Sequence, residues 1–288
     1  MKQALITVLS ALFLFSSCHS AAAPGPQAAP RTAIAPEDFP DFLPTEIEEY
    51  VPKVRALTET KTEDGFWDVS DADISAIDPS RKLISFTLDD SPSKTLENIL
   101  AVFASFNEEN PDCPASATLF CNGCYFNGSS VHNLHAAYAL GWEMGNHTYA
   151  HLDLTTLSDA DLQTEIDRTD ELLSTVDNKP RHLLRPPFGK ADERIKKAEA
   201  PVIDWTIDTL DWTGTSSDKI YETVFSQKFD GAIVLMHDGY ENTVDALKRL
   251  LPDLKAAGYQ VTSVSQMAKA NDCPLKNGGT YIRARKKS

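Results

Sequence analysis

The sequence predicts an α/β fold: a single domain built on a parallel sheet that is closed or nearly closed as a barrel. Two observations predict it. From about residue 81 to residue 270, short apolar runs alternate with segments whose apolar residues recur at helical spacing. Acids, histidines and an arginine also follow the ends of five of these runs. In a parallel barrel the C-terminal ends of the strands share one face.

Strand and helix signals alternate in chain order from Arg81. We expect strands in the apolar runs 82–88, 116–120, 142–146, 181–185, 202–208, 231–237 and 259–264. We expect helices over 94–106, over 129–140, after Ser158, and between residues 237 and 259. Ser158 with Asp161 is typical of a helix N-terminus. The last of these helices has one apolar face, formed by Val244, Leu247, Leu251 and Leu254.

The N-terminal residues 1–23 have the pattern of an export signal. Lys2 precedes a run of about 12 apolar residues, which is too short for a bilayer span of about 20. Cleavage after the small residues 21–23 fits this pattern. Lipidation of Cys18 also fits, because "FSSC" is similar to a bacterial lipoprotein signal, although Phe15 stands where leucine is usual. Both routes predict an exported protein, either secreted or anchored at the cell envelope.

The remaining segments differ in composition. Residues 24–44 are rich in Ala and Pro and predict a flexible linker, and residues 45–80 predict an N-terminal extension that packs on the barrel. The catalytic domain is expected over 81–270, followed by a C-terminal tail over 271–288. We expect the basic residues of that tail to be solvated and frayed; they are Arg283, Arg285, Lys286 and Lys287.

Charge and cysteine content narrow the class of protein. A net charge of -15 argues against nucleic acid and anionic membranes as partners, because both require a basic surface. Apart from Cys18, the chain has an even number of cysteines, which in an exported protein predicts two disulfides of undetermined pairing. These are Cys113, Cys121, Cys124 and Cys273. A redox or zinc role for the "CNGC" pair is less favoured, because no second CxxC accompanies it.

The strand ends carry the candidate chemistry. Asp89 and Asp90 follow the first strand, and two adjacent carboxylates do not readily stay ionised without cationic partners. His147 and His151 follow another strand, and a histidine pair at this spacing is either a pair of metal ligands or an ordinary polar pair on a helix face. An Asp-His-His set with Arg185 nearby would resolve the charge conflict, and three ligands with an open position describe a catalytic zinc site.

Five ordered motifs resemble the polysaccharide deacetylase family with the NodB homology domain, carbohydrate esterase family four. The resemblance covers about residues 82–268. The motifs are "TLDD" (87–90), "HTYAH" (147–151), "RPPFG" (185–189), "DTLDW" (208–212) and "LMH" (235–237). The resemblance implies a distorted, incomplete (β/α) barrel with fewer strands than the regular eight.

The resemblance also implies a role for each matching residue. Asp89 would be the general base and Arg185 would orient it, while Asp90, His147 and His151 would hold a divalent metal. His237 would be the general acid, kept charged by Asp211. Three further residues would contact substrate: Phe188 through its backbone N–H, and Trp212 and Leu235 as walls of an acetyl pocket. Asp208 would only brace its loop.

Two departures from the family pattern stand out. Leu88 and Ser91 replace the usual Phe and Gly of the first motif, and Ser91 puts the rate or the substrate preference in doubt. The segment between "RPPFG" and "DTLDW" is also shorter than is usual in the family.

The residues and the resemblance together predict a hydrolase that removes N-acetyl groups from peptidoglycan or chitin-like oligomers. We expect Zn²⁺, with Co²⁺ or Mn²⁺ as alternatives, and a monomeric protein with an acetylated polysaccharide as partner and, in the lipoprotein case, a lipid anchor at Cys18. An O-acetyl xylan esterase using the same site is the enzymatic alternative. A catalytically inactive cell-wall-binding lipoprotein is the alternative from another class.

Overall fold

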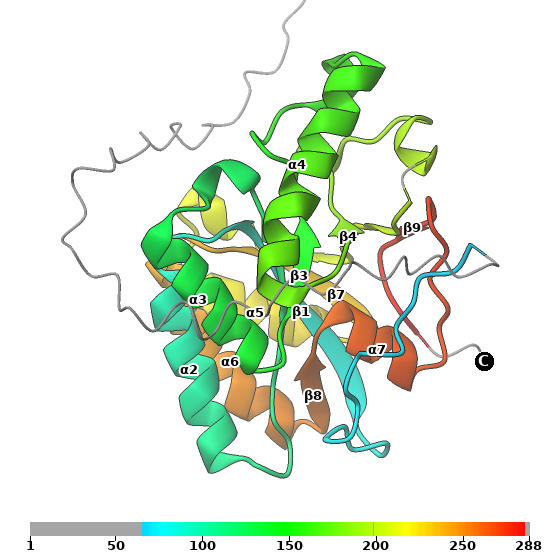
Figure 1. Cartoon of the computed structure of the whole chain (residues 1–288). Helices are drawn as coiled ribbons and strands as arrows, with labels where there is room; N and C mark the ends of the chain where they lie inside the picture. Colours follow the sequence, from blue (N-terminus) through cyan, green and yellow to red (C-terminus); the bar gives the residue numbers. More distant parts are fainter. Residues whose placement is uncertain (1–64, 198, 286–288) are drawn as a thin grey trace, which may run out of the picture. The chain divides into compact units, whose positions relative to one another are not determined.

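The computed structural model describes residues 65–197 and 199–285, in which parallel strands form one curled sheet covered by helices (Figure 1). This is the distorted barrel-like fold that the sequence predicts, although the described residues form nine strands rather than fewer than eight. The expected signal, Cys18, the linker over 24–44 and the first part of the 45–80 extension lie outside the described residues. Within them, no helix is both long and apolar enough to cross a membrane.

Every pairing between named strands of the sheet is parallel, so the strands deliver their C-terminal residues to the same edge. β1 is central, with β7 on one side and with β8 and β2 sharing the other side. The strands are β1 (Lys82–Ser91), β2 (Thr118–Cys121), β3 (Glu143–Asn146), β4 (Leu183–Leu184), β5 (Val202–Ile203), β6 (Ile207–Asp208), β7 (Ala232–His237), β8 (Tyr259–Thr262) and β9 (Thr280–Tyr281).

Helices and short 3₁₀ turns fill the connections. The α-helices are α2 (Leu96–Glu109), α3 (Gly128–Ala139), α4 (Asp159–Asp177), α5 (Ser217–Gln227), α6 (Glu241–Ala256) and α7 (Val264–Ala270). The 3₁₀ turns are η2 (Gly123–Tyr125), η3 (Leu154–Thr156), η4 (Pro187–Gly189), η5 (Ile195–Lys197) and η6 (Asp211–Thr213). Ser158 caps α4 by accepting a hydrogen bond from the Asp161 N–H, as predicted, whereas α5 and α7 have no counterpart among the predicted elements.

Alternation along β1 separates two cores. Ile84, Phe86 and Leu88 point outward into the larger hydrophobic cluster, beneath α2, α5 and α6. Leu83 joins the second cluster, inside the barrel, with Phe120 of β2 and residues of α7. Farther along this inner face, Thr87 and Asp89 replace apolar side chains, so the barrel interior becomes polar toward the C-terminal edge.

The barrel seam lies within the predicted strand 202–208. That run breaks into β5, which pairs with β4, and β6, which pairs with β7 at the opposite end of the sheet. Residues 204–206 therefore cross from one edge to the other, and the Thr206 N–H donates to the Ile233 carbonyl at 3.0 Å. The chain itself closes the seam here.

Residues 271–285 complete the barrel, in contrast to the frayed tail expected from their basic composition. β9 pairs with β5, and the Ala284 N–H donates to the Gly231 carbonyl at 3.0 Å beside β7. An unpaired β5 edge would expose backbone hydrogen-bonding groups, and β9 satisfies them. The barrel thus continues past residue 270 to Arg285.

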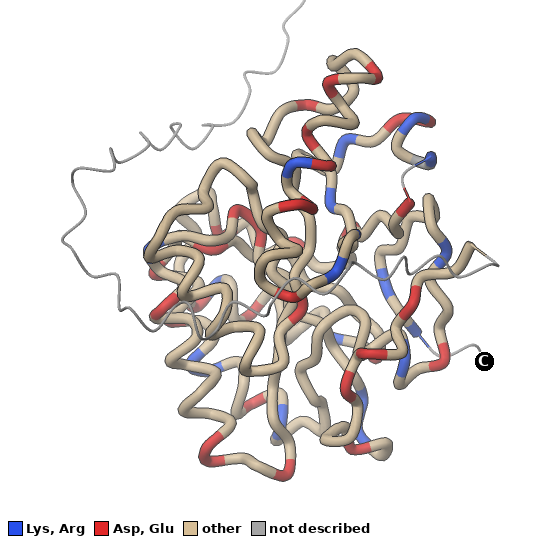
Figure 2. The backbone as a smooth tube through the Cα atoms, viewed as in Figure 1, with Lys and Arg blue, Asp and Glu red and all other residues tan. Residues whose placement is uncertain are grey.

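Residues 65–80 also contact the barrel. The Trp67 backbone N–H donates to the Leu275 carbonyl at 2.7 Å, and the Trp67 side chain packs against the interior cluster. Lys179 and Asp71 form an ion pair at 2.6 Å. Acidic and basic residues are interspersed along the whole described backbone (Figure 2). The segment is therefore held by polar and apolar contacts.

The structure shows no disulfide among the described cysteines, which are Cys113, Cys121, Cys124 and Cys273. Cys121 lies at the end of β2 in the outer cluster, whereas Cys273 packs against the interior cluster. Cys113 is buried after α2 and Cys124 is exposed in η2. The fold thus places these thiols in separate environments.

Substitution of Gly231 tests the closure by residues 271–285. Gly231 has φ +87, and an added Cβ would lie 2.7 Å from the Ala284 carbonyl oxygen. Gly231→Ala should lower the free energy of unfolding by about 2–4 kcal/mol, from the left-handed backbone and the clash together. Gly258→Ala is the control, because Gly258 has φ +81 but no atom near its Cβ position. Equal losses in urea unfolding would show that the clash is absent.

Candidate active site

Asp89 sits at the end of β1 in contact with a fully buried guanidinium. Arg185, the residue after β4, donates from Nη1 to Asp89 Oδ1 at 2.7 Å and to Thr87 Oγ1 at 2.7 Å. Its Nε and Nη2 donate to the carbonyls of Ile203 and Asp204, at 2.8 and 3.2 Å. The guanidinium also lies over the Phe120 ring. Every edge of the buried cation is thus occupied.

The charge on Asp89 follows from these surroundings. Burial alone would raise the pKa of this carboxyl, but Arg185, His147 and His237 outweigh it and hold the pKa below its ordinary value. Asp89 is therefore an ionised carboxylate inside a largely enclosed site, able to accept a proton.

Asp90, His147 and His151 converge beside it. Asp90 Oδ1 lies 3.6 Å from His151 Nε2 and 3.9 Å from His147 Nε2, and the three ligand atoms lie within 4.8 Å of one another. One carboxylate oxygen and two imidazole nitrogens form a set that zinc and related divalent ions accept. The geometry therefore provides a possible metal site.

The two histidines are oriented for ligation. His147 Nδ1 lies 2.6 Å from the Arg185 carbonyl, which can only accept, so Nδ1 carries a proton. Nε2 faces the two carboxylates, at 3.5 Å from Asp89 and 3.9 Å from Asp90. Burial, and then the neighbouring His147, lower the pKa of His151 to about 4, so its imidazole is neutral at pH 7. Both residues lie in a loop rather than on a helix face.

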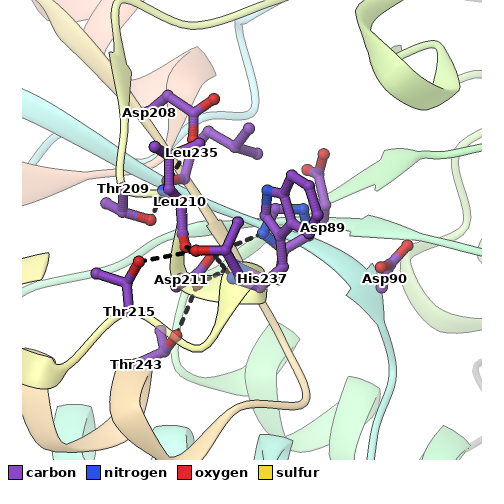
Figure 3. Close-up of polar contacts among 12 residues, drawn as sticks. Asp89, Asp90, Asp208, Thr209, Leu210, Asp211, Thr215, Leu235, His237 and Thr243 are labelled. Atoms are coloured by element: carbon purple, nitrogen blue, oxygen red, sulfur yellow. Dashed lines mark hydrogen bonds and ion pairs between the residues drawn. The ribbon is translucent and has the colours of Figure 1, made fainter. Parts of the chain in front are cut away.

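His237 ends β7 directly opposite Asp89 in the β1–β7 register. Its Nδ1 and backbone N–H donate to the two oxygens of Asp211, at 2.7 and 2.8 Å, and Thr243 Oγ1 donates to Asp211 Oδ2 at 2.6 Å (Figure 3). Burial would lower the pKa of His237, but the bond to Asp211 and the nearby carboxylates raise it to about 9. His237 is therefore a cation at neutral pH, with Nε2 available to donate.

The three residues expected to contact substrate lie around these charged groups and make fewer contacts with them. Phe188 has a left-handed backbone, is 49% exposed, and meets the His151 ring at 4.7 Å between centroids. Trp212 is half-buried, and its backbone N–H donates to Asp211 Oδ1. Leu235 lies two residues before His237 on the same face of β7. Asp208 Oδ1 accepts from the Leu210 N–H, so it braces the loop.

Sequence reasoning missed three buried polar residues around this site. Asp238 accepts hydrogen bonds from the Ser93 N–H, Ser93 Oγ and Thr95 Oγ1, at 2.7, 2.7 and 2.9 Å. Asn122 bonds the backbone on both sides of β2, as described below. The position of Asp238 next to His237 was the only signal in the sequence, because the burial of these residues depends on distant segments.

The third missed residue is His182, which precedes β4. It is 2% exposed and lies between Asp170 at 2.8 Å and Asp177 at 3.1 Å. Burial would lower its pKa, but the two carboxylates raise it to about 9. Asp170 in turn accepts from Asn146, the residue before His147.

The unusual Ser91 is fully buried. Its backbone carbonyl accepts from the Asn122 N–H at 2.8 Å, whereas its Oγ has no hydrogen-bond partner among the described residues. The hydroxyl therefore makes no hydrogen bond to the candidate metal ligands.

Known proteins are similar to this chain in sequence and in fold. Residues 76–201 match the family model described as polysaccharide deacetylase. The chain is 29% identical to the peptidoglycan-N-acetylmuramic acid deacetylase PdaC of Bacillus subtilis over 66% of this chain and 40% of PdaC. The solved PdaC structure superposes with a TM-score of 0.61 and 28% identity, covering 68% of this chain and 94% of that one.

Two further relatives are named for other substrates. A peptidoglycan-N-acetylglucosamine deacetylase of Bacillus cereus is 29% identical over 64% of this chain and 67% of its own length. A bifunctional xylanase/xylan deacetylase of Cellvibrio japonicus is 30% identical over 61% of this chain and 26% of its own length. The chain thus spans less than half of some relatives. Residues 76–201 therefore correspond to a polysaccharide deacetylase domain, and the barrel is similar to the fold of the solved relatives.

Neutralising each acid of the Asp89–Asp90 pair should have unequal effects on stability. Asp89→Asn leaves the buried Arg185 cation without a carboxylate, which should lower the free energy of unfolding by about 3–5 kcal/mol. Asp90→Asn removes a more exposed carboxylate with no cation of that kind against it, and should change stability by less than about 1 kcal/mol. Urea unfolding in a chelator measures both, and similar losses would contradict the buried-pair argument.

Proposed function

We propose that this protein is a metal-dependent hydrolase that removes N-acetyl groups from an amino-sugar polymer, with peptidoglycan as first substrate and chitin-like oligomers as second. The observation that carries the proposal is the placement of an ionised Asp89 between a three-ligand metal set and a cationic His237. Acid and base chemistry are thus available on both sides of one reacting bond.

Asp90, His147 and His151 would hold the ion, for which we propose Zn²⁺ on the basis of its preference for mixed imidazole and carboxylate ligands. A divalent ion bound there supplies a Lewis acid that polarises the acetyl carbonyl and acidifies a water molecule. Asp89 takes the proton that the attacking water loses, and Arg185 keeps the carboxylate ionised and oriented for this.

Product release requires a proton on the leaving nitrogen. His237 Nε2 donates it as the carbon–nitrogen bond breaks, while Asp211 holds the Nδ1 proton and stabilises the cation. A carbon–oxygen bond to water forms and a carbon–nitrogen bond breaks, giving acetate and a free amine. The backbone N–H of Phe188 would face the oxyanion, and Trp212 and Leu235 would enclose the acetyl methyl group.

The relatives supply the choice of substrate. The Bacillus proteins are named for peptidoglycan, and the export signal expected over residues 1–23 would bring this protein to the cell wall, secreted or lipid-anchored at Cys18. The Cellvibrio protein, named for xylan, favours an O-acetyl esterase as second candidate, because the same groups can hydrolyse an ester. A released amine identifies the first activity and a restored hydroxyl the second.

Acetate release tests the metal requirement. After chelation, the protein should release acetate from N-acetylglucosamine oligomers and peptidoglycan only when zinc, cobalt or manganese is restored, with a matching amount of free amine. His147→Ala should lower kcat/KM roughly a thousandfold, since metal polarisation contributes several kcal/mol. His132→Ala, an exposed histidine on α3, is the control and should retain full activity. Full activity in His147→Ala would refute the proposal.

The pH dependence tests His237. Because the acid must be protonated, kcat/KM should decline as pH rises through about 9, the raised pKa of His237. Asp211→Asn removes the main group that raises this pKa, so the alkaline limb should move to lower pH. Asp208→Asn, a neighbouring acid that only braces its loop, should leave the limb in place. If the alkaline limb of the kcat/KM profile does not move in Asp211→Asn, a group other than His237 is the acid.

A further inference from the structure

We propose that Asn122 is a positioning residue for the metal site, which fixes the Asp90 segment (residues 89–95) against the His147 segment (residues 146–151). This inference rests on the proposed function, since it concerns the same three ligands. Asn122 touches none of the ligand atoms and acts only through the backbone that carries them.

The topology puts Asn122 between the two segments. It follows β2, whose neighbours β1 and β3 lead into Asp90 and His147. Its backbone N–H donates to the Ser91 carbonyl at 2.8 Å, one residue after Asp90. Its side-chain Nδ2 donates to the His147 carbonyl at 2.6 Å and to the Thr148 carbonyl at 3.3 Å. A single buried residue therefore bonds both ligand-bearing segments.

The side chain is there as a donor. Asn122 is fully buried, and its Oδ1 has no hydrogen-bond partner among the described residues. A buried unpaired oxygen is unfavourable, so the benefit of this amide lies in the two carbonyls that Nδ2 holds. An apolar residue of similar volume would avoid that penalty but would leave both carbonyls without this donor.

The ligand-bearing backbone requires such support. Asp90, Thr148 and His151 have φ angles of 60°, 68° and 55°, in the left-handed region that residues with a Cβ rarely adopt. Strained conformations persist only where the surroundings fix them. Asn122 holds the carbonyl of Thr148 directly, and Asp238 holds Ser93 and Thr95 on the far side of Asp90.

Metal affinity measures this role without any substrate. Zinc is titrated by calorimetry into the full-length protein after its metal and the chelator have been removed. Asn122→Leu and Asn122→Ala should bind zinc about 10–100-fold more weakly than the parent protein, which is the range typical of groups that support metal ligands. The cobalt-substituted variants should also show an altered visible absorption spectrum, because the ligand geometry changes. Thermal unfolding in chelator identifies which variant is folded for the titration.

Asn271→Ala is the matched control. Asn271 is also buried and its Nδ2 also donates to a backbone carbonyl, that of Ala284, beyond α7 and away from the metal ligands. It should lose stability but keep the parent's zinc affinity and cobalt spectrum. An unchanged affinity in the Asn122 variants, or an equal loss in Asn271→Ala, would overturn the inference. A parent protein that binds no zinc or cobalt would instead refute the proposed metal site, and the inference with it.

Discussion

The buried guanidinium of Arg185 is the interaction on which the rest of the structure depends. A cation inside a barrel is unfavourable unless a carboxylate faces it and each N–H finds an acceptor. Asp89 meets the first need, and this fixes the charge state of the proposed base. The carbonyls of Ile203 and Asp204 help to meet the second, and these residues stand where β5 ends and the chain begins to cross the seam. Arg185 therefore serves both the charge of the proposed base and the closure of the barrel.

Around this pair, the fold separates two histidines by environment. His151 is largely buried beside another imidazole, which keeps it neutral, whereas His237 is held by Asp211 and becomes cationic. One residue type, histidine, thus provides a candidate metal ligand on one side of Asp89 (His151) and a candidate acid on the other (His237). Pairs of groups whose pKa values are driven apart in this way are typical of acid–base sites.

The sequence predicted the parts of this site that follow from local pattern. Asp89, Asp90, His147, Arg185 and His237 each stand at or just after the end of an apolar run, so parallel strands bring them to one edge without further information. The break between β5 and β6 could not be seen, because Val202 to Asp208 reads as one continuous strand until the seam requires a crossing. The roles of Asn122, Asp238 and His182 depend on partners that are far away in sequence.

Long-range pairing also explains features that composition does not predict. The even cysteine count predicts disulfides, whereas no disulfide joins the described cysteines, and the fold puts Cys121 and Cys273 on different sides of the sheet. The basic composition of residues 283–287 predicted a solvated, frayed end. Among the described residues, Arg283 and Arg285 are exposed as predicted, but Ala284 between them is fully buried against Gly231. Composition describes what a segment prefers in isolation, whereas residues 280–284 form backbone hydrogen bonds with β5 and with the start of β7.

The place of β9 in the chain has a consequence for how the protein is made. β9 bonds the Asp204 N–H through the Tyr281 carbonyl, and the Asp204 carbonyl in turn accepts from Arg185. The frame around the proposed base therefore remains incomplete until β9 has been synthesised. Closing the barrel requires a contact between segments about 80 residues apart, a separation that slows folding. The order of synthesis thus leaves the surroundings of Asp89 open until a late stage of folding.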